Sequence, residues 1–308
     1  MTKTKKLLSV LLSVILLFCA VSPAFAAVET PFENSRFYEI GDYSIHYRVF
    51  EAKEQKGQIF MIHGFALSSY CFQSLAERLQ AAGYTCVIAD LPDFGYSTRE
   101  TEETDKLPRE DIMHSLMMSL SGDPWYVAGH SMGGYIAIAL AEKYPNDVKN
   151  LLLYGTSGND GTSTLRRKLM SNPAFMKVMG RFLELAARMN ALVRLLLLAA
   201  TEDLQFTRDY DISYITDPYA VSGSGEGALI NFTMLPETDF EAFSNLPPVL
   251  YVNAANDTVI AKKDVQKLRN HLPEGSTDIT LASGGHLFIE SRVEKTAEIT
   301  LEFLAAHP

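Results

Sequence analysis

One serine is marked as chemically active by the residues around it. Ser131 follows the apolar run 125–130, and Gly129-His130-Ser131-Met132-Gly133 fits the G-x-S-x-G pattern. In that pattern a tight strand-to-helix turn exposes the serine hydroxyl, and a β-carbon at the flanking glycines would meet neighbouring backbone. The free N–H groups at the start of the next helix suit an oxyanion. The pattern is short, so the rest of the chain must show whether Ser131 is a nucleophile.

A serine nucleophile needs a histidine that accepts its proton. His286 is the best placed, because it lies in Ser283-Gly284-Gly285-His286, directly after the last expected strand. Ligands bind at the carboxyl ends of the strands in an open parallel sheet, where both Ser131 and His286 are expected. His130 is adjacent to the serine in the chain, so we expect its ring to point away from Ser131 and to pack in the core.

The histidine in turn needs an acid that orients it and stabilises its cationic form. Asp257 follows the strand expected at 248–253 and is the favoured residue. Asp160, which follows the strand expected at 151–154, is the alternative. Aspartates after strands also serve simply as turn residues, so the position alone does not prove either role.

Two backbone N–H groups are predicted to form the oxyanion hole. Met132 supplies one because it follows the nucleophile, and the loop after an earlier strand supplies the other. That loop is His63-Gly64-Phe65, which makes the Phe65 N–H the second donor. We interpret His63 as a structural residue that shapes the loop.

The elements expected around these residues alternate between strands and helices. Residues 37–50 predict a β-hairpin that turns at Gly41-Asp42, and short apolar strands are expected at 58–62, 85–89, 125–130, 151–154, 248–253 and 278–281. Apolar residues at helical spacing lie between most of these strands, which predicts an α/β fold with a mostly parallel sheet flanked by helices. The alternation stops over 158–243, which we interpret as a helical cap insertion between core segments 27–157 and 244–308.

The apolar segment Arg181–Ala200 lies within this insertion. Its internal charges make it a poor membrane span, because a span needs about 20 predominantly apolar residues. We interpret it as a cap helix packed on the core, with a second role as a lid that lines an apolar substrate pocket.

The first 26 residues have the layout of a secretory signal peptide. Three lysines precede the apolar run 7–18, and Ala24-Phe25-Ala26 is a typical cleavage signal. We therefore expect cleavage near Ala26, export from the cytoplasm, and no stable membrane span afterwards. An uncleaved anchor is the alternative, but the run is short for one.

The composition restricts the partners. Removal of the leader changes the formal net charge from −10 to −13, because the leader carries three lysines and no acid. A surface this acidic argues against nucleic acid and against anionic membranes as partners. The histidines show no metal-ligand spacing and no phosphate-binding loop is evident, so no cofactor or metal is expected. Cys71 and Cys86 remain after cleavage, and the sequence leaves open whether they form a disulfide.

These segments together resemble the α/β-hydrolase superfamily, in its capped serine-hydrolase branch. The resemblance rests on His63-Gly64-Phe65, the loop 90–97, the serine turn, Asp257 and His286, in the chain order of that family. It extends from about residue 36 to the C-terminus and is loosest across the insertion. Two features depart from the family pattern: Asp93 replaces a usual glycine, and no proline follows Asp257 at the common spacing.

The sequence therefore predicts an exported serine hydrolase. Ser131 would form an acyl-enzyme with a carboxylic ester that has an apolar acyl or alcohol part, and His286 and Asp257 would complete the triad. An amide, peptide or C–C bond hydrolase with the same triad is the first alternative. A non-catalytic binding protein of the same fold is the second, because a fold does not establish a function.

Overall fold

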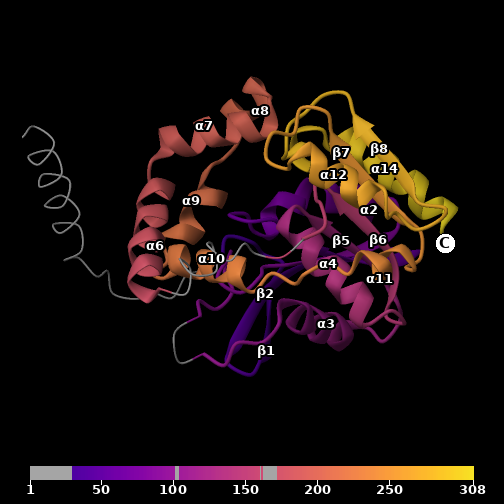
Figure 1. The fold of residues 1–308 in the computed structure, drawn as a ribbon, viewed down its shortest axis with the longest axis horizontal. Helices are drawn as coiled ribbons and strands as arrows, with labels where there is room; N and C mark the ends of the chain where they lie inside the picture. The colour runs from indigo at the N-terminus through magenta and orange to yellow at the C-terminus, as the bar shows by residue number, and fades with distance from the viewer. Residues whose placement is uncertain (1–29, 101–103, 160, 162–171) are drawn as a thin grey trace, which may run out of the picture.

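The structure, a computed structural model, describes residues 30–100, 104–159, 161 and 172–308. An eight-stranded sheet runs through its centre in the order β1-β2-β4-β3-β5-β6-β7-β8 (Figure 1). The strands are β1 Ser35–Ile40, β2 Tyr43–Phe50, β3 Gly57–Ile62, β4 Tyr84–Ala89, β5 Trp125–His130, β6 Val148–Tyr154, β7 Val249–Ala254 and β8 Thr277–Leu281.

Strand directions agree with the predicted fold class. β1 and β2 form an antiparallel hairpin with Ile40 opposite Tyr43, and Gly41 takes a φ of 55° in the turn, as the sequence predicted. β2 also pairs antiparallel with β4, whereas the neighbours from β4 to β8 all pair in parallel. The predicted α/β architecture with a mostly parallel sheet is confirmed.

Helices cover both faces of this sheet. Phe60 and Val127 pack on one face, with residues of the helices α3 and α4. Ile59 and Ala128 pack on the other face, with residues of α2 and α14. Because side chains alternate along a strand, both faces can be buried only if the strands are continuously apolar. The helices α2 Gln73–Ala81, α3 Arg109–Leu120, α4 Met132–Lys143, α12 Lys262–Arg269 and α14 Val293–Ala306 lie in the core, with the short η1 Ser69–Phe72 and α13 Phe288–Ser291.

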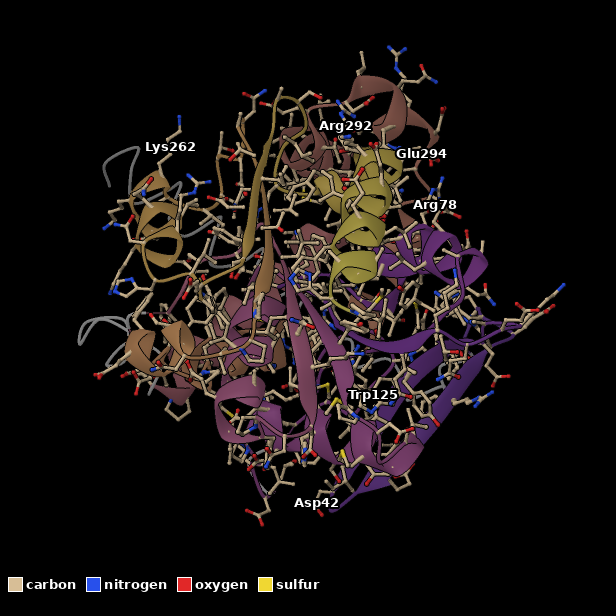
Figure 2. All side chains as sticks on the ribbon, turned by 90° about the vertical axis from the view of Figure 1, so that its right-hand side faces the viewer. Asp42, Arg78, Trp125, Lys262, Arg292 and Glu294 are labelled. Carbon is tan, nitrogen blue, oxygen red and sulfur yellow. The ribbon has the colours of Figure 1, made fainter. Side chains whose placement is uncertain are left out.

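Contacts between distant segments bind these layers together. Arg78 on α2 donates a hydrogen bond to Glu294 on α14, and Figure 2 shows the two residues on neighbouring helices.

Cys71 and Cys86 are both buried and both free, so the disulfide that the sequence left open is not formed.

Only helices are found in the described part of the stretch between β6 and β7. They are α6 Pro173–Ala187, α7 Asn190–Thr201, α8 Leu204–Asp209, α9 Ser213–Ala220, α10 Ser224–Thr233 and α11 Phe240–Ser244. Figure 1 shows α6 to α10 grouped to one side of the sheet, and α11 close to α4. We call α6 to α10 the inserted helices; the predicted bounds of the insertion, 158–243, stay a prediction.

The expectation of one cap helix over Arg181–Ala200 was wrong. The segment is split between α6 and α7, because the chain leaves the helical path at Arg188 and Met189. The sequence analysis also missed α13, a single turn directly after the histidine loop. None of the helices in the described ranges is long and apolar enough to cross a membrane.

Candidate active site

Ser131 lies at the carboxyl end of β5, in a tight turn that leads into α4. Its φ of 52° and ψ of −119° are unusual for a residue with a side chain, and such strain is typical of functional turns. A β-carbon on Gly129 would lie 2.6 Å from the Gly133 carbonyl oxygen, and one on Gly133 would lie 2.2 Å from the Ile62 carbonyl oxygen. The close approach of α4 to two strands therefore requires glycine at both positions.

The structure brings the three predicted triad residues into one hydrogen-bonded row. His286 Nε2 lies 2.8 Å from Ser131 Oγ, and His286 Nδ1 lies 2.7 Å from Asp257 Oδ2. Ser131 and His286 are 8% and 9% exposed, so solvent reaches the row only at its edge. With Asp257 holding a proton on Nδ1, the free Nε2 can accept the serine proton.

The surroundings of Asp257 keep it ionised. Burial of this carboxyl favours its neutral form, but hydrogen bonds to His286 and to backbone N–H groups outweigh burial and hold its pKa below the ordinary value. The N–H groups of Val259 and Ile260 donate to Oδ1 at 2.8 and 3.1 Å, which leaves Oδ2 for the histidine. The alternative acid, Asp160, lies outside the described residues.

The two predicted oxyanion donors flank the serine. Met132 begins α4, where backbone N–H groups lack helical partners. A β-carbon on Gly64 would lie 3.0 Å from Ser131 Cβ, which places the loop that carries Phe65 against the serine. Neither N–H donates a hydrogen bond to another described residue. An oxyanion formed on Ser131 is the natural acceptor for both.

Comparison with known proteins agrees with this geometry. Residues 58–293 match the family described as alpha/beta hydrolase fold. The chain belongs to this family.

Relatives within the family carry different names. The chain is 35% identical over 102 residues to Lipase 3 of Moraxella sp. (strain TA144), a match that covers 32% of each protein and therefore about a third of the lipase's length. It is 23% identical over 261 residues to the pimeloyl-[acyl-carrier protein] methyl ester esterase of Xylella fastidiosa, covering 81% of this chain and 96% of that one. The enol-lactonase from Burkholderia xenovorans LB400 shares the fold, with a TM-score of 0.69 at 14% identity over 88% of this chain and 100% of that one.

Two further histidines of this α/β hydrolase lie close to the triad. His130 is fully buried, and its Nε2 lies 3.0 Å from the His286 carbonyl oxygen, so it contacts the backbone of the histidine loop. Burial and the nearby His286 lower the pKa of His130 to about 3, which keeps it neutral. His63 accepts a hydrogen bond of 3.0 Å from the Leu91 N–H, in agreement with its expected structural role.

The histidine loop is also held by the inserted helices, which the sequence analysis missed. The N–H groups of Gly285 and Leu287 donate to the carbonyl oxygens of Thr201 and Ala200, at 3.2 and 2.7 Å. The carbonyl groups of a helix's last turn lack partners within the helix, so the end of α7 can accept these bonds. Polar backbone atoms carry no sequence signal, which is why this contact was not predicted.

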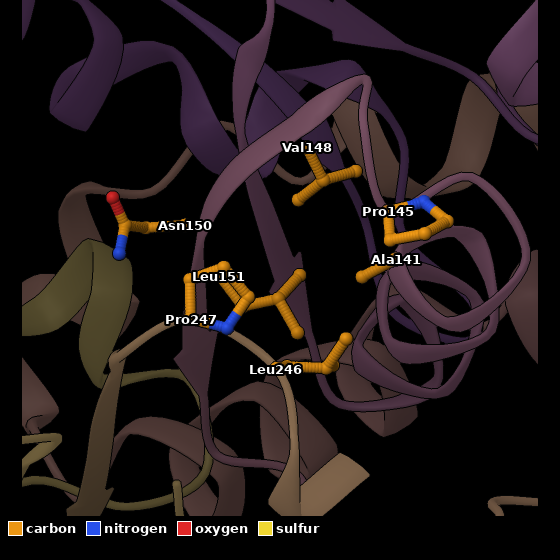
Figure 3. A pocket seen from close by; sticks show the side chains of 7 residues that line it. All are labelled: Ala141, Pro145, Val148, Asn150, Leu151, Leu246 and Pro247. Carbon is orange, nitrogen blue, oxygen red and sulfur yellow. The ribbon is translucent and has the colours of Figure 1, made fainter. Parts of the chain in front are cut away.

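One apolar crevice lies away from the triad. Figure 3 shows its lining, which is Ala141, Pro145, Val148, Asn150, Leu151, Leu246 and Pro247. Val148 begins β6, whereas Ser131 follows the end of the parallel strand β5. The crevice therefore lies at the amino ends of these strands, and the triad lies at their carboxyl ends. Within the described ranges, no cluster of three or more His, Cys, Asp or Glu side chains could hold a metal ion.

Proposed function

We propose that this α/β hydrolase is a serine hydrolase that cleaves carboxylic esters through an acyl-enzyme on Ser131. The observation that carries the proposal is the row in which His286 Nε2 lies 2.8 Å from Ser131 Oγ while Nδ1 lies 2.7 Å from Asp257. Such a row supplies a nucleophile, a base and a group that stabilises the charged base.

The reaction follows in two halves. Ser131 Oγ attacks the ester carbonyl carbon as its proton passes to His286 Nε2, and His286 then gives this proton to the departing alkoxide, which leaves as the alcohol. A water molecule, deprotonated by His286, attacks the acyl carbon, and the proton returns to Ser131 as the acid leaves. Asp257 remains ionised throughout and stabilises the cationic imidazole.

The N–H groups of Phe65 and Met132 stabilise the negative oxygen in both halves. Loss of one such donor typically lowers the rate by roughly 10² to 10³. Both donors are backbone groups, so changing either side chain is expected to cost much less.

Apolar ester substrates are favoured by the surroundings of the oxyanion loop. The Phe65 ring lies 4.5 Å from the ring of Phe232 on α10 and 5.8 Å from that of Phe94, measured between centroids. A lipase and a methyl ester esterase among the relatives support the same substrate class.

The decisive experiment is a Ser131→Ala variant tested with short-chain nitrophenyl esters and a fluorophosphonate probe. We expect both turnover and labelling to disappear, while Ser74→Ala, at an exposed serine on α2, keeps both. Persistent labelling of Ser131→Ala would overturn the assignment. A panel of matched esters and amides then distinguishes an esterase from an amide hydrolase.

We further propose that the protein is exported by a signal peptide cleaved near Ala26. Residues 1–26 lie outside the described part of the chain, so the support is the sequence layout alone. N-terminal sequencing of the protein from the culture medium should begin at Ala27. An intact N-terminus on cell-associated protein would contradict this.

A further inference from the structure

Large apolar side chains gather in solvent on the inserted helices. Val178, Phe182, Leu185 and Met189 are 59%, 60%, 45% and 54% exposed, and Leu195, Leu196 and Leu204 on α7 and α8 are 62%, 60% and 52% exposed. Only Phe37 and Val259 are comparable elsewhere in the described ranges. A concentration of this kind on one part of a surface typically marks an interaction site.

The spacing on α6 shows which way its apolar side chains point. Val178, Phe182 and Leu185 follow one another at intervals of four and three, which places them on one face of α6, and Met189 lies two residues past the end of this helix. Gly180 is on the opposite face, because a residue two positions away is turned by about 200°. A β-carbon on Gly180 would lie 2.5 Å from the Glu226 backbone nitrogen of α10. The face that contains Gly180 is therefore packed on α10, and the apolar face points away from it.

Figure 1 shows the same arrangement, with α10 between α6 and the sheet. The apolar face of α6 is thus on the outer surface of the molecule.

Basic side chains border this outer face. Lys177 and Arg181 on α6, and Arg188 directly after its last residue, are exposed and lie along one edge of the apolar row. The acidic residue of α6, Glu184, points inward, since its Oε1 accepts hydrogen bonds of 3.0 and 3.3 Å from the N–H groups of Gly223 and Gly225. The outer face of α6 is therefore apolar and positively charged, on a chain whose formal net charge is −10.

We propose that the outer face of α6 docks on an anionic lipid surface. An apolar helix face bordered by Lys and Arg is the arrangement that lies in a lipid interface, with the apolar side chains inserted and the basic groups at the head groups. The negative net charge of the chain argues against an anionic membrane as a partner of the average surface, but not of a patch that is itself positively charged. At physiological ionic strength charges act over about 8 Å, so the local basic residues dominate this contact.

A second copy of the chain fits this face less well. In a symmetric dimer each partner uses the same patch, so the interface would gather two sets of the three basic side chains without adding an acidic group from this helix face. An anionic lipid surface instead offers negative charge along the whole helix. Docking is a property of the outer face of α6 and does not depend on the proposed catalytic chemistry.

The test is co-sedimentation of the full chain with vesicles of phosphatidylcholine, alone or with phosphatidylglycerol. Using the Ser131→Ala protein prevents hydrolysis of the lipid and separates docking from catalysis. We expect binding to the mixed vesicles that weakens with added salt. Changing Lys177, Arg181 and Arg188 to Gln should reduce the affinity about fivefold for each charge, or about a hundredfold together. Phe182→Ser combined with Leu185→Ser should reduce it roughly tenfold or more.

A matched control changes three exposed lysines on other surfaces, Lys53, Lys262 and Lys263, to Gln and should bind as the parent does. Circular dichroism melting of every variant confirms that the fold is retained. Equal binding by the control and α6 variants would overturn the proposal, as would the absence of binding to mixed vesicles. A concentration-dependent dimer that the α6 variants abolish would assign this face to a second copy instead.

Discussion

The side-chain amide of Asn231 donates a hydrogen bond of 2.9 Å to Oδ2 of Asp93. It joins α10, an inserted helix, to the loop that follows β4, and both side chains are buried. Oδ1 of Asp93 accepts a bond of 2.7 Å from the Glu100 N–H, and its φ of 71° is one that glycine adopts more easily. The aspartate that departs from the family's usual glycine therefore holds an inserted helix on the core, and the neighbouring Phe232 contacts the oxyanion loop.

Arg109 completes this buried group, and its loss should destabilise the fold. Its Nε donates to Asn231 Oδ1 at 2.9 Å, and its Nη1 and Nη2 donate to the two Glu100 oxygens at 2.8 and 2.9 Å. Arg109→Leu would leave buried carboxylates without their cation, which typically costs about 3 to 5 kcal/mol. Urea unfolding measures this loss. Arg36→Leu, which removes an exposed ion pair with Glu51, should cost less than about 1 kcal/mol. Similar losses in both variants would contradict the role of the buried group.

Glu290 is expected to make stability depend on pH. Burial raises the pKa of this carboxyl from its ordinary value of 4.5 to about 8, and its Oε1 lacks a hydrogen-bond partner among the described residues. Between these pH values the folded state keeps a proton that the unfolded state releases, so stability falls as pH rises, by at most about 1.4 kcal/mol per pH unit. Below pH 4.5 this carboxyl causes no loss of stability, and above pH 8 the loss stays constant.

Glu290→Gln removes this dependence. Thermal unfolding across the same pH range should show that the stability of Glu290→Gln rises relative to that of the parent from pH 4.5 to 8. The stability of Glu298→Gln, which removes an exposed ion pair with Lys295, should change with pH as the parent's does. Parallel profiles for parent and Glu290→Gln would contradict the buried, protonated state.

Gly133→Ala should disturb the serine turn. The added methyl group would lie 2.2 Å from the Ile62 carbonyl oxygen, so α4 must shift away from β3. Overpacking of this kind typically costs about 1 to 3 kcal/mol, and a displaced Met132 N–H should also lower kcat. Chemical denaturation and ester kinetics measure the two effects. Gly122→Ala, where no atom lies within 4 Å of the new methyl group, should change neither.

Asp257→Asn should lower kcat on nitrophenyl esters by roughly 10³ to 10⁴ with little change in KM. An amide cannot stabilise the cationic form of His286 and favours the wrong tautomer. Asp160→Asn is the matched comparison, and its kcat should stay near that of the parent. Small, equal losses in both variants would show that neither aspartate belongs to the triad.

The sequence by itself determined the strands of the sheet, most of the helices between them, and the order of the predicted site residues along the chain. Apolar runs and helical spacings are local signals. The glycines around Ser131 indicate a tight turn in which backbone segments lie too close together for a β-carbon. These signals predicted the hairpin at Gly41 and the parallel sheet. They did not predict the break of the Arg181–Ala200 segment into two helices.

Only the tertiary structure decided how distant residues meet. It brought His286 within 2.8 Å of Ser131, across 155 positions of the chain, and it explained Asp93 through Asn231 and Arg109. It also showed which side of α6 is packed and which is exposed, although the net charge suggested an acidic surface throughout. The physical reason is that hydrogen bonds between buried polar groups, and the faces that helices present, depend on packing between segments far apart in sequence.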